Sequence, residues 1–186
     1  MSESHYSHNQ KCVITELDTV LKSISEQEIE QLLQALLAAE KVFIIGVGRV
    51  KISLSAFAKR LNHLGIKTWL VGDVNEPPIG SNDLLLVGSG SGESLFPKNI
   101  AICAQKYHAK IAHLTSSPKS SIAQMADVIV DFHCNSKSGD GIKTIQPMTT
   151  LFEQALMIFG DLICLEIARR KGLTPEQVAT QHANLE

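Results

Sequence analysis

The sequence predicts an α/β fold, a three-layer αβα sandwich built on a five-stranded parallel sheet. Two observations predict it: five short apolar runs recur between residues 41 and 131, and helical patterns or turns separate them. Short apolar strands that alternate with helices are typical of parallel sheets covered on both faces. The five runs are Lys41–Gly46, Lys67–Val71, Asp83–Val87, Lys110–Leu114 and Asp127–Asp131. The expected strand order is the flavodoxin-like 2-1-3-4-5.

The whole chain, residues 1–186, is expected to form a single domain. A chain of 186 residues with 44% hydrophobic content is long enough for one sizeable core. Residues 1–10 are polar and are expected to be a flexible tail, and two helical patterns follow within residues 11–40. Ser25 suits the N-cap of the second helix.

Three further segments follow the last expected strand. The polar stretch 135–143 is interpreted as an active-site loop or a lid. A long apolar helix is predicted at Thr150–Lys171, and residues 172–186 are predicted to form a short C-terminal helix and tail.

Charge and hydropathy exclude several classes of partner. With 17 Lys and Arg against 19 Asp and Glu, the chain has no excess positive charge, so no nucleic-acid partner is expected. No apolar run approaches the roughly 20 residues that span a bilayer, so we expect no membrane association and a cytoplasmic location. The four cysteines form no CxxC pair, which argues against disulfides and a zinc site. They are expected to be buried, with a reactive thiol at Cys134 as the alternative.

The segment Asp83–Ser94 (DLLLVGSGSGES) is the strongest functional signal, because an apolar strand leads directly into a loop of small residues. Its glycines allow backbone N–H groups to turn toward an anion, and its serines add hydroxyl donors. A helix that begins just after the loop would add a partial positive charge. The candidate phosphate ligands are Ser89, Ser91, Gly92 and Ser94. A flexible turn without a ligand is the alternative interpretation.

A second glycine-rich turn, GVGR at Gly46–Arg49, follows the first strand. In the expected strand order the first and third strands are neighbours at the topological switch point, where ligands bind. Gly48 and Arg49 are therefore expected to face the same crevice as the serine loop. The GxGxxG dinucleotide fingerprint fails because Lys51 stands at its third glycine, and the serine loop lacks the GK[ST] of a P-loop. A small phosphorylated metabolite fits better than a nucleotide.

Glu153 and His182 each allow two interpretations. The sequence Thr150–Glu153 has the pattern of a capping box, in which the glutamate only satisfies the helix N-terminus. The same position would also hold a carboxylate base in a partly buried pocket. His182, near the C-terminus, is either a solvated side chain or a catalytic group.

Four segments resemble the sugar isomerase (SIS) domain family, and within it the 6-phospho-3-hexuloisomerases. They occur in the order and spacing of that family: GVGR with residues 56–65, then VGSGSGES, then QPMTTLFEQAL at 146–156, and HANLE at the end. The serine loop is common to SIS domains, whereas the last two segments are more specific to the hexuloisomerases.

The resemblance implies isomerisation of arabino-hex-3-ulose 6-phosphate and fructose 6-phosphate, without a metal or organic cofactor. It implies that Ser89, Ser91 and Ser94 bind phosphate and that Glu153 is the catalytic base. It also implies a homotetramer with active sites near subunit interfaces, in which His182 approaches the site of a neighbouring subunit.

The chain departs from the family pattern at one position of the first turn. The family usually has GxGRS, whereas Val50 and Lys51 follow Arg49 here. Lys51 is expected to compensate for the lost hydroxyl by its charge, and Ser53 and Ser55 are not expected to reach the site. Two alternatives stay open: another phosphosugar aldose-ketose isomerase, and a phosphosugar-binding sensor without catalytic activity.

Overall fold

The computed structural model describes residues 4–135 and 141–185, and its centre is a five-stranded sheet with the order β2-β1-β3-β4-β5. All four neighbouring pairs are parallel, which confirms the predicted fold class and strand order. The strands are β1 (Val42–Ile45), β2 (Thr68–Leu70), β3 (Leu84–Gly88), β4 (Lys110–Thr115) and β5 (Val128–Asp131). Each strand lies within one residue of the apolar run that predicted it.

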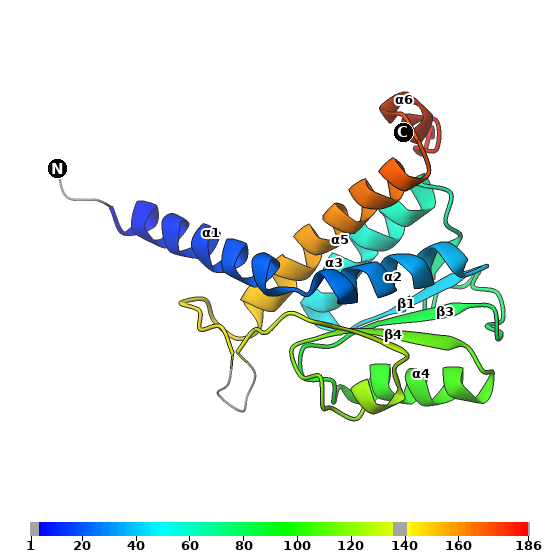
Figure 1. Ribbon diagram of the computed structural model, residues 1–186, viewed down its shortest axis with the longest axis horizontal. Coiled ribbons are helices and arrows are strands. Elements are labelled where there is room, and N and C mark those ends of the chain that lie inside the picture. Colours follow the sequence, from blue (N-terminus) through cyan, green and yellow to red (C-terminus); the bar gives the residue numbers. More distant parts are fainter. Residues whose placement is uncertain (1–3, 136–140, 186) are drawn as a thin grey trace.

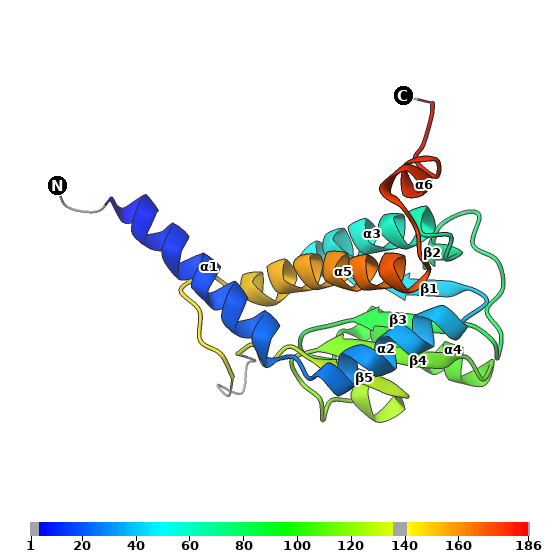
Figure 2. The same cartoon turned by 45° about the horizontal axis from the view of Figure 1, so that its top comes forward.

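The two faces of the sheet have separate cores, because successive strand side chains point to opposite sides. Val42, Ile44 and Leu86 pack in the larger core, beneath helices α2 (Glu26–Ala38), α3 (Gly48–His63) and α5 (Thr150–Arg170). On the other face Phe43 and Leu85 pack in a smaller core with α4 (Leu95–Lys106) and the short 3-10 helix η1 (Ala123–Met125). Figure 1 shows these layers, with α2, α3 and α5 on one side of the strands and α4 on the other, and Figure 2 shows α3 and α5 side by side.

The N-terminal helix α1 (His5–Ser23) begins earlier than the sequence predicted. The side chain of Ser4 accepts a hydrogen bond from the backbone N–H of Ser7 at 3.2 Å, and this cap starts the helix within the expected tail. Residues 5–10 are therefore helical. Much of α1 projects from the body of the molecule, and its C-terminal part, with Leu17 and Val20 buried, packs near α5 (Figure 1).

The other predicted helix ends agree with the structure. Ser25 caps α2 by accepting a hydrogen bond from the N–H of Gln27, and Thr174 forms a capping box at α6 (Pro175–Ala179). Residues 136–140 lie outside the described residues, so the expected loop or lid there stays a prediction. Within the described part of the chain, every helix is too short or too polar to cross a membrane.

A histidine is fully buried in β4, beneath the serine loop. The Nδ1 atom of His113 lies 3.1 Å from the carbonyl oxygen of Val87, and its Nε2 atom has no hydrogen-bond partner. Burial lowers the pKa of His113 to about 4, against a weaker opposing effect of the Val87 carbonyl. The unfolded chain therefore binds a proton at His113 more readily than the folded chain does. As a result, the free energy of unfolding falls when the pH drops below the ordinary pKa of histidine.

We expect the free energy of unfolding to fall by about 2 kcal/mol through His113 alone when the pH is lowered from 7 to 5. The loss occurs as the pH falls from the ordinary histidine value toward 4. Urea unfolding at both pH values, for the wild type and the His113→Gln variant, measures it. The variant should lose about 2 kcal/mol less than the wild type over this interval, and the exposed His108→Gln should behave as the wild type. An equal loss in wild type and His113→Gln would contradict the assignment.

Candidate active site

The serine loop, residues 88–94, connects β3 to the N-terminus of α4, as the sequence predicted. The hydroxyls of Ser89 and Ser94 lie 3.0 Å apart, and the N–H of Gly92 donates to the Ser89 hydroxyl at 3.1 Å. Ser91 is exposed on the loop surface, and its hydroxyl accepts a hydrogen bond from the N–H of Glu93 at 3.3 Å. Hydroxyls and a helix N-terminus therefore gather at one place, which suits an anion.

Gly92 is the position at which this loop admits no side chain. Its φ is +62°, a region that favours glycine, and a Cβ atom there would lie 1.9 Å from the hydroxyl oxygen of Ser120. Its carbonyl accepts a hydrogen bond from the N–H of Ile122 at 3.2 Å, and the carbonyl of Gly90 accepts one from the N–H of Ser116 at 3.1 Å. The segment after β4 thus fixes the shape of the loop.

The first glycine turn lies beside the serine loop, because Ile45 and Val87 pair at the ends of β1 and β3. A Cβ atom on Gly88 would lie 2.6 Å from Leu54 Cδ1 and 3.0 Å from Val50 Cγ1. Gly46 approaches the same two side chains. The two strand ends therefore meet at α3, as the switch-point prediction requires. Val50 is buried between them, so its side chain serves packing at the position where the family usually has a serine.

Gly48 and Lys51 are on the exposed first turn of α3. Gly48 has a φ of +57°, with open space around the position of a Cβ atom. Room is therefore available beside the turn, and we keep both residues as predicted substrate contacts.

Glu153 is 8% exposed in the first turns of α5 and has a defined set of partners. One carboxylate oxygen, Oε2, accepts a hydrogen bond from Arg49 Nε at 2.5 Å, and the other, Oε1, accepts one from the hydroxyl of Thr149 at 2.8 Å. The hydroxyl of Ser53 donates to the backbone carbonyl of Glu153 at 2.8 Å. Two predicted site residues, Arg49 and Glu153, are thereby brought into contact from positions 104 residues apart.

The capping-box interpretation of Glu153 is wrong. The N-cap of α5 is Thr149, and the hydroxyl of Thr150 donates instead to the carbonyl of Pro147 at 2.7 Å. A capping box would need Thr150 as the N-cap, with Glu153 three positions after it. Since the N-cap is Thr149, Glu153 is four positions after the N-cap, and its carboxylate turns toward α3. The glutamate is therefore held by side chains rather than used to cap backbone.

The expectation that Ser53 would not reach the site also needs correction, since its hydroxyl meets Glu153. Thr149 is a second residue that sequence reasoning did not assign to the site. Its only signal was a hydroxyl residue four positions before the glutamate. Ser55 is turned back onto its own helix, where its hydroxyl donates to the carbonyl of Lys51.

Phe152 joins the serine loop to the start of α5. Its Cδ1 atom lies 3.2 Å from the position of a Cβ atom on Gly90, and its ring packs edge-on against Phe132 with 5.2 Å between centroids. Phe132 directly follows β5. The serine loop, the end of β5 and the helix turn that carries Glu153 therefore converge at the carboxyl edge of the sheet.

His182 lies elsewhere in its own chain. Its ring is 5.5 Å from that of His63, the last residue of α3, whereas Glu153 contacts Arg49 at the start of that helix. Fourteen residues of α-helix separate these two ends by about 20 Å. His182 therefore does not act at Glu153 of the same chain, and its approach to a neighbouring subunit stays a prediction.

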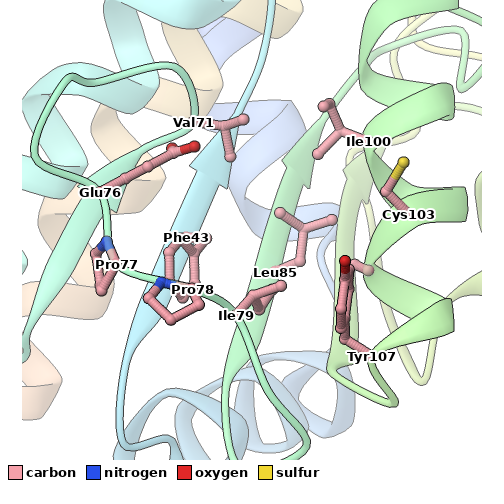
Figure 3. Close-up of a pocket in the computed structure, with 11 residues that line it drawn as sticks. Phe43, Val71, Glu76, Pro77, Pro78, Ile79, Leu85, Ile100, Cys103 and Tyr107 are labelled. Carbon is pink, nitrogen blue, oxygen red and sulfur yellow. The ribbon is translucent and has the colours of Figure 1, made fainter.

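Two cavities differ in their suitability for a phosphosugar. A polar recess of about 460 Å³ is lined by the serine loop, the segment after β4 and the end of β5, including Ser91, Ser117, Lys119 and His133. Another cavity, of about 290 Å³, lies between α4 and the segment after β2 (Figure 3). Its walls are mainly apolar, with Phe43, Pro78 and Ile79 facing Ile100 and Tyr107. The polar recess adjoins the predicted phosphate loop.

The cysteines offer no reactive thiol in this region. Burial raises the pKa of Cys134 to about 11 and that of Cys164 to about 12. A thiol that stays protonated is a poor nucleophile, which excludes the reactive alternative for Cys134. Over residues 4–135 and 141–185, no three His, Cys, Asp or Glu side chains are grouped so that they could hold a metal ion.

The family model of the SIS domain matches residues 35–158, which include both glycine turns, the serine loop and Glu153. The chain belongs to the SIS domain family. A 3-hexulose-6-phosphate isomerase of Bacillus subtilis is 39% identical over 176 residues, which cover 94% of this chain and 95% of that protein. The protein of the same description from Methylomonas aminofaciens is 34% identical, with 95% and 98% covered.

A solved structure from Methanococcus jannaschii, for which a function as 3-hexulose-6-phosphate isomerase was inferred, superposes on this SIS domain with a TM-score of 0.84. Its sequence is 28% identical, and the match covers 96% of this chain and 99% of that one. The likeness to this solved structure thus extends over nearly the whole chain, beyond residues 35–158 that the SIS family model matches.

Proposed function

We propose that this SIS domain is a phosphosugar isomerase that interconverts arabino-hex-3-ulose 6-phosphate and fructose 6-phosphate. The observation that carries the proposal is the buried carboxylate of Glu153, held by Arg49 at the sheet edge where the serine loop also lies. Two relatives described as 3-hexulose-6-phosphate isomerases match nearly their full length at 39% and 34% identity, which supports this substrate. In terms of reaction class it would be an intramolecular oxidoreductase.

The serine loop would bind the phosphate through Ser89, Ser91, Ser94 and the N–H of Gly92. Binding at this remote end holds the open-chain sugar so that its reacting carbons lie beside Glu153. The carboxylate removes the proton from C2 of the 3-ketose, which gives a cis-enediol, and returns it to C3, which gives the 2-ketose.

Arg49 would stabilise the negative charge that develops on the enediolate oxygen. Its side chain is 64% exposed, so the substrate can reach it without unfolding the helix turn. Lys51 and Gly48, one turn or less away on α3, complete the sugar-binding face. The guanidinium of Arg49 would then contact both the carboxylate of Glu153 and the enediolate oxygen, while the carboxylate itself reaches C2 and C3.

A homotetramer is part of the proposal, with active sites near subunit interfaces and His182 beside the site of a neighbour. Its support is the apolar surface of α5, on which Met157, Ile158, Leu162 and Leu165 are exposed. A helix that is apolar around most of its circumference is expected to be covered on more than one side.

The experiment that tests the proposal is turnover of a panel of phosphosugars by the purified protein. We expect conversion of 3-hexulose 6-phosphate to fructose 6-phosphate, and slower or no conversion of aldose phosphates. Faster turnover of an aldose phosphate would favour another isomerase. Tight binding of phosphosugars without turnover of any of them would favour a sensor.

A further inference from the structure

We propose that His133 is a second catalytic residue, which relays the hydroxyl proton between the two reacting oxygens of the sugar while Asp131 positions its ring. This inference rests on the proposed function. The reaction moves two protons, one from C2 to C3 and one from the oxygen on C2 to the oxygen on C3. Glu153 accounts for the first proton, and the second needs a group that can both accept and donate.

The groups already placed near Glu153 do not fill this role. Arg49 has no lone pair to accept a proton, because its guanidinium stays protonated. His182 of the same chain lies at the opposite end of α3, so only the His182 of a neighbouring subunit competes with His133 for this role, and the His182→Asn variant below distinguishes the two. A histidine next to the serine loop would combine acceptor and donor in one ring.

His133 is held in an unusual position directly after β5. Its Nδ1 atom lies 3.2 Å from Oδ2 of Asp131, and its backbone N–H donates to Oδ1 of the same carboxylate at 2.8 Å. Asp131 is the last residue of β5 and is buried. His133 itself has a φ of +51°, which is uncommon for a residue other than glycine and is found often at functional sites.

The ring of His133 faces the cavity that the serine loop also lines. It is 45% exposed, and with Ser91 it belongs to the walls of the 460 Å³ recess. The preceding residue, Phe132, packs against Phe152, the neighbour of Glu153. We infer that a sugar with its phosphate on the loop would extend between His133, just after β5, and Glu153 on α5.

The contact of 3.2 Å between Nδ1 and the carboxylate of Asp131 assigns the roles of the two ring nitrogens. In the proposed relay Nδ1 carries the proton and faces the carboxylate, and Nε2 carries the lone pair. When Glu153 takes the C2 proton, the C–H electron pair forms the C2=C3 bond and the carbonyl electrons move to O3. Nε2 then takes the proton from O2–H and gives it to O3, and the C2=O bond forms as Glu153 returns its proton to C3. Every proton and electron pair is accounted for by these two side chains.

The first test compares two histidines with the same backbone conformation. We expect His133→Asn to lower kcat at least about 100-fold while KM changes less than about threefold. Asparagine tolerates a positive φ, so the turn should survive. His108→Asn is the matched control, because His108 has a φ of 58° but lies at the other end of the sheet, after α4. It should keep the kcat of the wild type.

Asp131→Asn should also lower kcat and leave KM nearly unchanged, because Asp131 acts by positioning the ring of His133. Unchanged kcat in His133→Asn, or a loss of kcat in His182→Asn alone, would overturn the proposal. Those results would leave the isomerase function intact, because wild-type turnover and its dependence on Glu153 are measured in the same assay.

The second test separates the two protons by incorporation of solvent deuterium. In D2O, His133→Asn should still exchange the C2 hydrogen of recovered 3-hexulose 6-phosphate, since Glu153 is intact, while conversion to fructose 6-phosphate is slow. The ratio of exchange to conversion should therefore rise well above that of the wild type. Equal loss of exchange and conversion would contradict the relay.

Discussion

Glu153→Gln should lower kcat for the isomerisation by at least about 1,000-fold, because glutamine fills the same volume but cannot accept the C2 proton. The amide oxygen can still accept the hydrogen bond from Arg49 or Thr149, so the fold and the phosphate loop should be kept. Steady-state kinetics with 3-hexulose 6-phosphate measures kcat, and calorimetric titration of the phosphosugar should give a Kd close to that of the wild type.

The chain offers a matched control on the same helix. Glu166 is also in α5 and is also bound by arginine, since Arg169 and Arg170 donate to its Oε1 at 2.6 and 2.8 Å. Glu166→Gln should therefore remove a comparable charge without lowering kcat. A kcat for Glu153→Gln within about tenfold of the wild type would rule out this residue as the base.

Gly92→Ala should destabilise the protein by about 2 to 4 kcal/mol and raise KM for any phosphosugar. Part of this cost is the left-handed backbone at φ +62°, and the larger part is the Cβ atom placed 1.9 Å from the hydroxyl oxygen of Ser120. The loop must shift to relieve that contact, which moves the N–H of Gly92 away from the phosphate. Urea unfolding and the KM for 3-hexulose 6-phosphate measure the two effects.

Gly172→Ala is the control that separates the cost of the left-handed backbone from the cost of the steric clash with Ser120. Gly172 has a φ of +63° after α5, with open space around its Cβ position, and it is remote from the serine loop. It should lose only about 1 to 2 kcal/mol and keep the wild-type KM. Equal losses of stability in the two variants, with KM unchanged in both, would mean that the serine loop tolerates a side chain at residue 92.

The serine loop could be located from the sequence because its determinants are local. An apolar strand, three glycines and three serines occur within a dozen residues, and the backbone preferences of those residue types hold in any context. The five strands could be located for the same reason. The start of α1 was placed too late because the cap at Ser4 depends on one side-chain hydrogen bond rather than on a repeating apolar pattern.

The partners of Glu153 could not be read in this way. Its hydrogen bonds to Arg49 and Ser53 join segments 104 and 100 residues apart, and the bond to Thr149 depends on an N-cap that the capping-box pattern places one residue later, at Thr150. His182 and His133 illustrate the same limit. His182 lies at the far end of α3, and His133 lines the polar recess because β5 ends at the same edge of the sheet as the strand that leads into the serine loop.

The sequence by itself determined the parallel sheet, its strand order, the position of the serine loop and the family to which they belong. These features follow from apolar periodicity and from glycine and serine chemistry over short stretches of chain. Only the tertiary structure decided which side chains hold the carboxylate, that Val50 packs between two strand ends, and which histidine shares a cavity with the loop. Those contacts depend on how α3, α5 and β5 pack at one edge of the sheet, and long-range packing leaves no local pattern in the chain.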